Sequence, residues 1–145
     1  MEIMINSEAT RRVVGDFIAY VRSGQEPDRA HEFMAPVVLA HQVESENETT
    51  IPRTPEDYAR HVRDMLATWG EFALTVDEFL VDGARAYVRL TQVGRHLAPV
   101  DGHAPTGRTV RQVNSIVYHV TDGLITEYWM QIDRAGLSAQ LRAAD

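Results

Sequence analysis

The sequence predicts an α+β fold, in which a curved antiparallel sheet is closed on one face by N-terminal helices. Helical patterns fill the first half of the chain, whereas the second half carries two Asp-Gly turns, at 82–83 and 122–123, between alternating apolar runs. Asp-Gly in that setting is the strongest short-range hairpin signal, because both central residues of a type I′ turn need a positive φ. Helices segregated from strands are typical of α+β domains, and a sheet that curls around a helical lid leaves a hollow for a small ligand.

The first half of the chain is expected to hold three helices and one strand. Asn6 or Ser7 can cap the first helix, which Gly24 ends, and Thr54 followed by Pro55 is a typical helix start. A segment rich in Glu, Asn and Thr without an apolar period is expected to be a loop. The expected elements are a helix over about 7–24, a short helix over 27–33, a strand over 36–43, this loop over 43–53 and a helix over 54–70.

The second half is expected to hold four strands in two hairpins and a short terminal helix. Leu137 and Leu141, at i and i+4, indicate that helix. The second hairpin is long enough to cross a small domain, so the rest of the fold is expected to pack on it. The expected ranges are strands over 72–81 and 84–97, a loop over 97–106, the second hairpin over 105–133 and a helix over 134–144.

Composition excludes several classes of function. The chain has 145 residues and no cysteine, and 21 acidic against 14 basic residues give a net charge of −7. This length predicts one domain over 1–145, without disulfides, thiolate metal sites or a cysteine nucleophile. The acidic balance argues against nucleic acid and anionic membranes as partners. No signal peptide or membrane-spanning run is recognisable, so a cytoplasmic protein is expected.

Several motifs lie in the second half of the chain. They are Gly94-x-His96, Pro105-Thr106-Gly107-Arg108 and Asp122-Gly123-x-Ile125-x-Glu127-x-Trp129, and the strand PVVLAHQV carries His41. With the order of the elements, this pattern resembles the SnoaL-like polyketide cyclases. The resemblance implies the cone-shaped α+β barrel that the family shares with ketosteroid isomerase and nuclear transport factor 2. It also implies a small, apolar, polyketide-like substrate and no cofactor.

The chain departs from the resemblance at the catalytic positions. In cyclases that close a ring by aldol chemistry, a carboxylate directly follows the Trp, and here that position is Met130. The Asp that ketosteroid isomerase uses as an oxyanion donor falls near Ile116. The general base of that enzyme lies on the first strand, where this chain has His41. The mechanism that the resemblance implies therefore cannot be transferred residue by residue.

Alternation along the second hairpin predicts which side chains face the hollow. If Met130 faces inward as in the family, Thr126, Tyr128 and Ile132 share its face. A carboxamide pointed into a core leaves donors unpaired, at a cost of about 1 to 3 kcal/mol, so inward amides favour a polar ligand. If the assignment of faces is wrong by one residue, these amides point to the outer side of the sheet instead. The inward residues of the preceding strand are expected to be Gln112, Asn114, Ile116 and Tyr118.

The candidate catalytic residues are His41, Asn114 and Tyr128. His41 is the acid or base candidate, because only His has an unperturbed pKa near neutrality, and the alternative is a structural histidine. Asn114 and Tyr128 could donate to a substrate carbonyl, or Tyr128 could pack with its hydroxyl at the rim of the core. The six histidines lack metal-ligand spacing, so no metal is expected. The candidate substrate-binding residues are Tyr20, Trp69, His96, Gln112, Ile116, Tyr118 and Met130.

The leading hypothesis is a cofactor-independent cyclase that acts on a polyketide-derived intermediate. Ring closure by cycloaddition, or by conjugate or aldol addition, would rely on positioning and neutral hydrogen-bond donors. Positioning contributes about 7 to 11 kcal/mol in favourable intramolecular reactions. The alternatives are a non-catalytic binding or dimerisation module, or an isomerase or hydrolase that uses His41. Val113, Val117 and Trp129 make the outer face of the sheet apolar, so a homodimer is expected through it.

Overall fold

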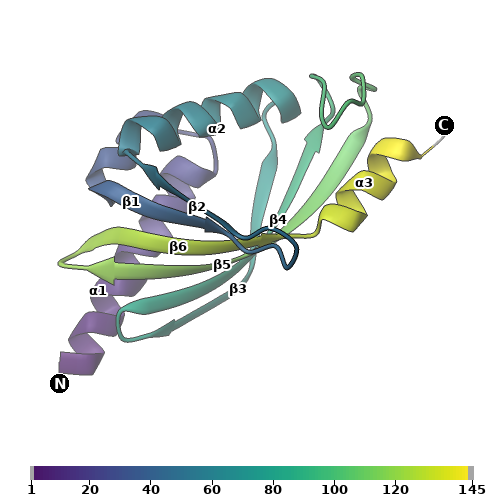
Figure 1. Cartoon of the computed structure of the whole chain (residues 1–145). Coiled ribbons are helices and arrows are strands. Elements are labelled where there is room, and N and C mark those ends of the chain that lie inside the picture. The colour runs from purple at the N-terminus through teal and green to yellow at the C-terminus, as the bar shows by residue number, and fades with distance from the viewer. Residues whose placement is uncertain (1, 144–145) are drawn as a thin grey trace.

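The helices pack on a single six-stranded curved sheet. The computed structural model describes residues 2–143, with side chains from residue 6 onward. Figure 1 shows α2 lying above the strands and α3 at the opposite end of the molecule from the start of α1. The elements are α1 (Glu2–Asp16), a π-helical segment η1 (Phe17–Arg22), a 3-10 helix η2 (Pro27–Glu32), β1 (Met34–Gln42), β2 (Thr49–Arg53), α2 (Pro55–Trp69), β3 (Ala73–Asp82), β4 (Arg85–Arg95), β5 (Thr109–Thr121), β6 (Leu124–Ile132) and α3 (Arg134–Arg142).

The predicted α+β class and its curved sheet are confirmed, with one difference in strand direction. The strands follow the order β2-β1-β6-β5-β4-β3, so β2 and β3 are edges and the sheet does not close. Every neighbouring pair is antiparallel except β1 and β6, which run parallel. Hairpin signals could not reveal this pair, because parallel strands are never joined by a short turn. The pairing joins the N-terminal half of the chain to the four-strand meander.

The core lies between the first helix, α2 and one face of the sheet. Val14, Phe17 and Val21 are fully buried and pack against strand residues such as Val88 and Ile116. Burying an apolar side chain of this size stabilises the fold by roughly 1.5 to 3 kcal/mol. The burial of these three residues therefore fixes which side of the first helix faces the sheet. No helix within residues 2–143 is both long and apolar enough to cross a membrane.

The first helix begins earlier than predicted and changes form before it ends. It starts at Glu2, so Asn6 and Ser7 lie inside it and the predicted cap is wrong. Ser7 instead accepts a hydrogen bond from the backbone N–H of Gly83 at 2.9 Å, which ties the helix to the β3–β4 turn. The last six residues are π-helical, and Gly24 follows them with φ +87°. The predicted end at Gly24 is thus confirmed.

The predicted loop over 43–53 contains a strand. Thr49–Arg53 pairs antiparallel with β1, from Val38 opposite Arg53 to Gln42 opposite Thr49. Its side chains are largely exposed, which is why no apolar alternation marks it. Pro52 fits here because an edge strand leaves one side of its backbone unpaired. The strand extends the sheet beyond β1 without adding to the core.

The second hairpin forms as predicted, with one bulge. Asp122 and Gly123 both have positive φ, 50° and 79°, as the turn requires. Between His119 and Val120 the β5–β6 register shifts. The shift buries Ile125 completely and leaves Thr126 half-exposed, bonded to the carbonyl of His119. The prediction that Thr126 faces the hollow is therefore wrong, because an extra residue breaks strict alternation.

The end of α2 is held against β4 at Gly94. A Cβ on Gly94 would lie 2.6 Å from the carbonyl oxygen of Trp69, closer than such atoms approach. We expect Gly94→Ala to lower the free energy of unfolding by about 1 to 3 kcal/mol, the usual cost of overpacking. Urea denaturation followed by circular dichroism measures this change.

Gly15→Ala is the matched control for that variant. Its Cβ would meet Phe79 Cε2 at 3.5 Å, an ordinary contact, and Gly15 lies inside α1. Because Gly is unfavourable within helices, the change should be neutral or stabilise by up to about 1 kcal/mol. Equal losses from the two variants would contradict a special close approach at Gly94.

Candidate functional site

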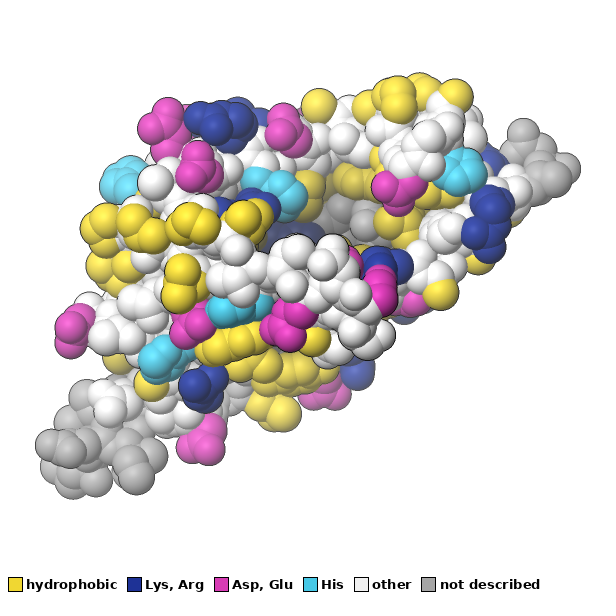
Figure 2. Space-filling view, in the orientation of Figure 1, with side chains coloured by type: hydrophobic (Ala, Val, Ile, Leu, Met, Phe, Trp, Pro, Cys, Tyr) yellow, Lys and Arg dark blue, Asp and Glu magenta, His cyan; other side chains and the backbone are white. Residues whose placement is uncertain are grey.

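A cavity of about 370 Å³ lies between α2 and the sheet, flanked by the 97–106 loop and the start of α3. Figure 2 shows the surface hollowed beneath α2, with hydrophobic side chains around the opening. The volume is within the range of small-molecule sites. The lining residues are Arg22, Gln42, Tyr58, His61, Met65, Thr68, Trp69, Gln92, Pro99, Val100, Asp101, Gln112, Asn114, Met130, Ile132 and Leu137.

A guanidinium and two carboxamides meet in the wall of this cavity. Arg22 is 3% exposed, and its Nη1 donates to Oε1 of Gln92 at 2.9 Å. The hydrogen-bond network orients the Asn114 amide so that Oδ1 accepts from Nη2 of Arg22 at 3.2 Å and nitrogen donates to the carbonyl of Val113 at 3.0 Å. The Arg22 Cζ also lies 5.7 Å from the centre of the Phe72 ring. Neutral groups therefore hold a buried cation in place.

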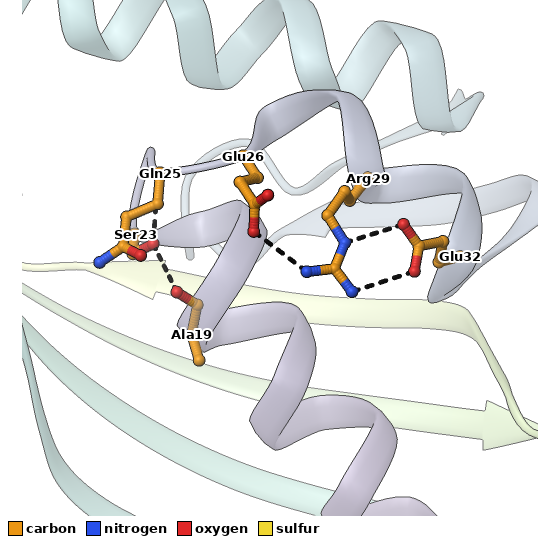
Figure 3. Close-up of polar contacts among 6 residues, drawn as sticks. All are labelled: Ala19, Ser23, Gln25, Glu26, Arg29 and Glu32. Atoms are coloured by element: carbon orange, nitrogen blue, oxygen red, sulfur yellow. Dashed lines mark hydrogen bonds and ion pairs between the residues drawn. The ribbon is translucent and has the colours of Figure 1, made fainter.

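The turn after Arg22 fixes the position of its backbone. Ser23 Oγ donates to the carbonyl of Ala19 at 2.7 Å and accepts from the backbone N–H of Gln25 at 3.3 Å. Figure 3 shows this turn beside Arg29, whose guanidinium bridges Glu26 and Glu32. The bridge ties η2 to the segment that follows η1. Arg22 thus reaches the cavity from the end of a π-helical segment that these bonds stabilise. Such π-helical segments are often found at functional sites.

His61 lies in the α2 wall and is uncharged at neutral pH. Burial is the largest cause that lowers its pKa from 6.5 to about 4, and the positive charges of Arg53 and Arg22 lower it further. His61 lines both the cavity and a second groove between β2 and α2, where Arg53 also lies. Its ring packs edge-on against Tyr58, 6.1 Å between centres. A neutral imidazole at this point can accept or donate one hydrogen bond between the cavity and its exterior.

Four candidate site residues predicted from the sequence lie in the cavity wall, together with Ile132, which was predicted to face inward. Trp69 comes from α2, Gln112 and Asn114 come from β5, and Met130 comes from β6. Ile116, Tyr118 and Tyr128 point to the same side of the sheet but lie deeper, each at most 3% exposed. They belong to the core that fills the closed end of the cone.

The tyrosines of this closed end form an aromatic cluster. The Tyr128 ring centre lies 6.0 Å from that of Tyr118 and 6.2 Å from that of Tyr58, and Phe17 contacts Tyr58 at 5.1 Å. Burial raises the pKa of all three hydroxyls, so they remain protonated. Only Tyr58 reaches the cavity lining. The expected roles of Tyr118 and Tyr128 at the substrate do not match this placement.

His41 lies on the outer face of the sheet, away from the cavity. Its Nδ1 contacts Thr50 Oγ1 at 2.7 Å, its Nε2 contacts Glu127 Oε2 at 2.5 Å, and its ring stacks on Trp129 with 5.0 Å between centres. The next residue of β1, Gln42, lines the cavity instead. The expectation that His41 acts on a ligand in the hollow is wrong, because alternation along β1 turns it outward.

His96 and Tyr20 also lie outside the cavity lining. His96 is fully buried, and its Nδ1 accepts from the backbone N–H of Thr106 at 3.4 Å, so it braces the loop after β4. Its Nε2 has no partner among the described residues. Tyr20 is 37% exposed, stacked on Phe33 and covered by the Arg29 guanidinium at 4.2 Å. The substrate contacts expected of these two residues do not match their places.

Sequence reasoning missed the cavity residues that come from separate elements. Gln42, His61 and Gln92 carry no signal of their own, since single polar residues on a strand or helix are common. Arg22 had one signal, because it follows Ile18 by four residues and so continues the apolar stripe of the first helix. A charged residue at a stripe position is expected to be buried and functional, or to mark the end of the stripe.

The curved sheet with a cavity of ligand size under α2 defines an α+β protein with room for a small molecule. The sequence profile described as SnoaL-like polyketide cyclase matches residues 12–141. The chain therefore belongs to the SnoaL-like polyketide cyclase family, as the motifs predicted. None of the curated proteins matches the chain.

Solved structures of the same fold include proteins with different chemistry. A candidate polyketide cyclase from Acidithiobacillus ferrooxidans matches with 19% identity and a TM-score of 0.80, over 94% of this chain and 96% of that one. IdmH from Streptomyces antibioticus, a candidate polyketide cyclase, matches with 23% identity and a TM-score of 0.75, over 92% and 99%. An LEH-like epoxide hydrolase from M. tuberculosis matches with 18% identity and a TM-score of 0.67, over 93% and 90%. At these identities the likeness shows the fold alone.

The neutral state of His61 predicts a pH-dependent stability. The unfolded imidazole takes up a proton below its ordinary pKa of 6.5, whereas the folded one does so only near 4. Stability is therefore full above pH 6.5 and falls as the pH drops toward 4. Between pH 7.5 and 5 we expect His61 to account for a loss of about 2 kcal/mol.

His61→Gln should remove that part of the loss. Urea denaturation of wild type and variant at both pH values gives the difference, and His31→Gln, at an exposed histidine of η2, controls for loss of an imidazole. A folded-state titration of His61 by NMR with its midpoint near 6.5 would contradict the assignment.

Proposed function

We propose that this chain is a cofactor-independent cyclase that closes a ring in a polyketide-derived intermediate bound in the cavity under α2. The observation that carries the proposal is the convergence of Arg22, Gln92, Gln112 and Asn114 on one cavity, which apolar side chains such as Met65, Trp69 and Met130 also line. Membership of the cyclase family supports the substrate class. An extended, greasy chain with several carbonyls fits such a lining, since apolar walls give affinity and a few polar groups fix orientation.

The proposed chemistry rests on positioning and on stabilising negative charge at oxygen. Met130 stands where the family's aldol cyclases have a carboxylate, and Asp101, on the exposed loop, is the one carboxylate in the described lining. In an aldol or conjugate closure the enolate carbon attacks an electrophilic carbon of the same chain, and charge develops on the acceptor oxygen. Arg22 is placed to stabilise such a charge, which is worth roughly 3 to 4 kcal/mol per donor at comparable sites. His61 can carry the proton between the chain and the outside.

A non-catalytic binding module remains the second candidate, and the apolar Met130 favours it. Binding of the chain without conversion is the outcome that would support this reading. An isomerase or hydrolase that uses His41 is not proposed, since His41 faces away from the cavity. Epoxide hydrolysis is not proposed either, because no described Asp or Glu lies within 4.0 Å of Arg22 to activate a water.

Filling the cavity should abolish conversion. We expect Gln112→Trp to lower the rate of ring closure about 100-fold, because misplacing the reacting atoms by about 1 Å has an effect of this size. The assay incubates purified protein with linear poly-β-ketone chains and follows the cyclised product by liquid chromatography and mass spectrometry. It compares each rate with the uncatalysed one.

Arg111→Trp is the matched control for this variant. Arg111 precedes Gln112 on β5 and is exposed, so the same bulk is added on the other face. Its rate should equal that of wild type. Equal rates for Gln112→Trp and wild type would place the reaction outside this cavity, and no rate above background for wild type would favour the binding module.

We also propose that the chain forms a homodimer through the outer face of the sheet. Leu80 and Val93 are 61% and 37% exposed there, and Trp129 is only half-buried. A second copy would cover these apolar side chains. Sedimentation should give a mass near twice that of the chain, and Leu80→Arg should shift it toward the monomer. A wild-type monomer at micromolar concentration would contradict the dimer.

A further inference from the structure

We infer that Arg22 forms an oxyanion subsite and that the ligand of the cavity is acidic, carrying a planar two-oxygen anion such as a carboxylate or the enolate of a 1,3-dicarbonyl. This inference rests on the proposed cavity and names the class of molecule that it takes. The sequence predicted only neutral hydrogen-bond donors in the cavity. The structure adds the positive charge of Arg22.

Arg22 differs in its partners from five arginines of the surface. Five exposed or half-buried arginines each lie within 4.0 Å of at least one carboxylate, as expected in a chain of net charge −7. The buried Arg22 has no such carboxylate among the described residues, and its partners are Gln92, Asn114 and the Phe72 ring. The five paired arginines are Arg29, Arg60, Arg63, Arg89 and Arg134.

The two amides orient the guanidinium without neutralising it. Gln92 and Asn114 are 2% and 5% exposed, and each accepts from a different terminal nitrogen of Arg22. Arginine stays protonated under all ordinary conditions, so a full charge remains in a place with little water. An uncompensated buried charge is costly. A site that keeps one, held in a fixed orientation beside a cavity, is suited to an anion that arrives with the ligand.

A second arginine adds to the positive potential. Arg53 of β2 lies near enough for its charge to act on Tyr58, His61 and Tyr128, as does that of Arg22. The Nε of Arg53 is buried and has no hydrogen-bond partner among the described residues. Two arginine charges therefore act on residues at this side of the cavity, which favours an anion over a neutral molecule.

The geometry of the guanidinium selects the kind of anion. Its planar fork matches two oxygens of a carboxylate or of the enolate of a 1,3-dicarbonyl, and charge-assisted pairs of this kind are about twice as strong as neutral ones. Met65, Trp69, Met130 and Ile132 give the same cavity an apolar wall. The ligand is therefore amphipathic, with an apolar body and one acidic end. The enolate of a 1,3-dicarbonyl bound here would have its nucleophilic carbon between the two oxygens that Arg22 holds.

The test compares acids with their neutral counterparts in calorimetric titrations at constant pH. One pair is decanoate and methyl decanoate. The other is 1-phenylbutane-1,3-dione and its 2,2-dimethyl derivative, which cannot enolise, at a pH that ionises the enol. We expect at least one acid to bind about 10-fold or more tightly than its neutral partner, the factor expected of a charge-assisted bond. A preference within the first pair would indicate a carboxylate ligand, and a preference within the second pair would indicate an enolate.

Variants assign the preference to Arg22. Arg22→Met keeps the length of the side chain and should weaken the acid about 10- to 100-fold while changing the neutral partner less than threefold. Arg22→Lys keeps the charge but loses the fork, and should fall between. Arg111→Met removes an exposed arginine and the same net charge, and should leave both affinities unchanged.

The thermal unfolding midpoint separates this role from a structural one. Arg22→Met removes a buried charge but leaves the amide oxygens of Gln92 and Asn114 without their donor, so the midpoint reports the bracing role and the acid preference reports the subsite. A lowered midpoint with an unchanged acid preference would mean that Arg22 only braces Gln92 and Asn114, and would overturn the inference. Equal affinities of the acid and its neutral partner for wild type would also overturn the inference, although the cavity would still bind a ligand. Failure of every probe to bind would overturn the proposed function as well.

Discussion

The parallel pairing of β1 with β6 determines which side chains the rest of the structure can use. It is the contact that joins the N-terminal half of the chain to the meander, and its register sets Gln42 opposite Met130 and His41 opposite Trp129. Because neighbouring residues of a strand point to opposite faces, one pair lines the cavity and the other lies on the outer face. A shift by one residue would exchange the two sets.

Packing at the closed end of the cone decides how large the cavity can be. Phe17, Tyr58, Tyr118 and Tyr128 fill the space between the first helix, α2 and the sheet. Their rings leave the hollow only at the wider end, where α2, the 97–106 loop and α3 surround it. Arg22, Gln92 and Asn114 therefore meet in the wall of the space that these rings leave open.

The arrangement of charge reverses between surface and interior. The chain has seven more acidic than basic residues, yet the described cavity lining has a buried guanidinium and one exposed carboxylate. Where related cyclases are expected to use a carboxylate beside the Trp, this chain has a thioether, and its first helix supplies a cation to the same cavity. Chemistry that depends on an anionic base would suit the first arrangement, and chemistry that depends on stabilising an anion suits the second.

The sequence by itself determined the elements that short-range physics controls. Asp122-Gly123 set a turn that needs positive φ, Thr54 and Asp57 formed a capping box, and alternation placed Asn114 and Met130 on the inner face. The same short-range patterns also failed at two places. They did not reveal β2, because an exposed edge strand has no apolar period, and they misplaced Thr126, because a bulge near it breaks the alternation.

Only the tertiary structure decided what the cavity contains. Arg22, Gln92 and Asn114 come from the first helix, β4 and β5, and Gln42 comes from a strand that no turn connects to its partner β6. The tertiary structure also places His41 outside the cavity and buries Tyr128 beneath the cavity. The physical reason is that contacts between residues 70 or more positions apart depend on how whole elements pack, and no local pattern of side chains encodes that packing.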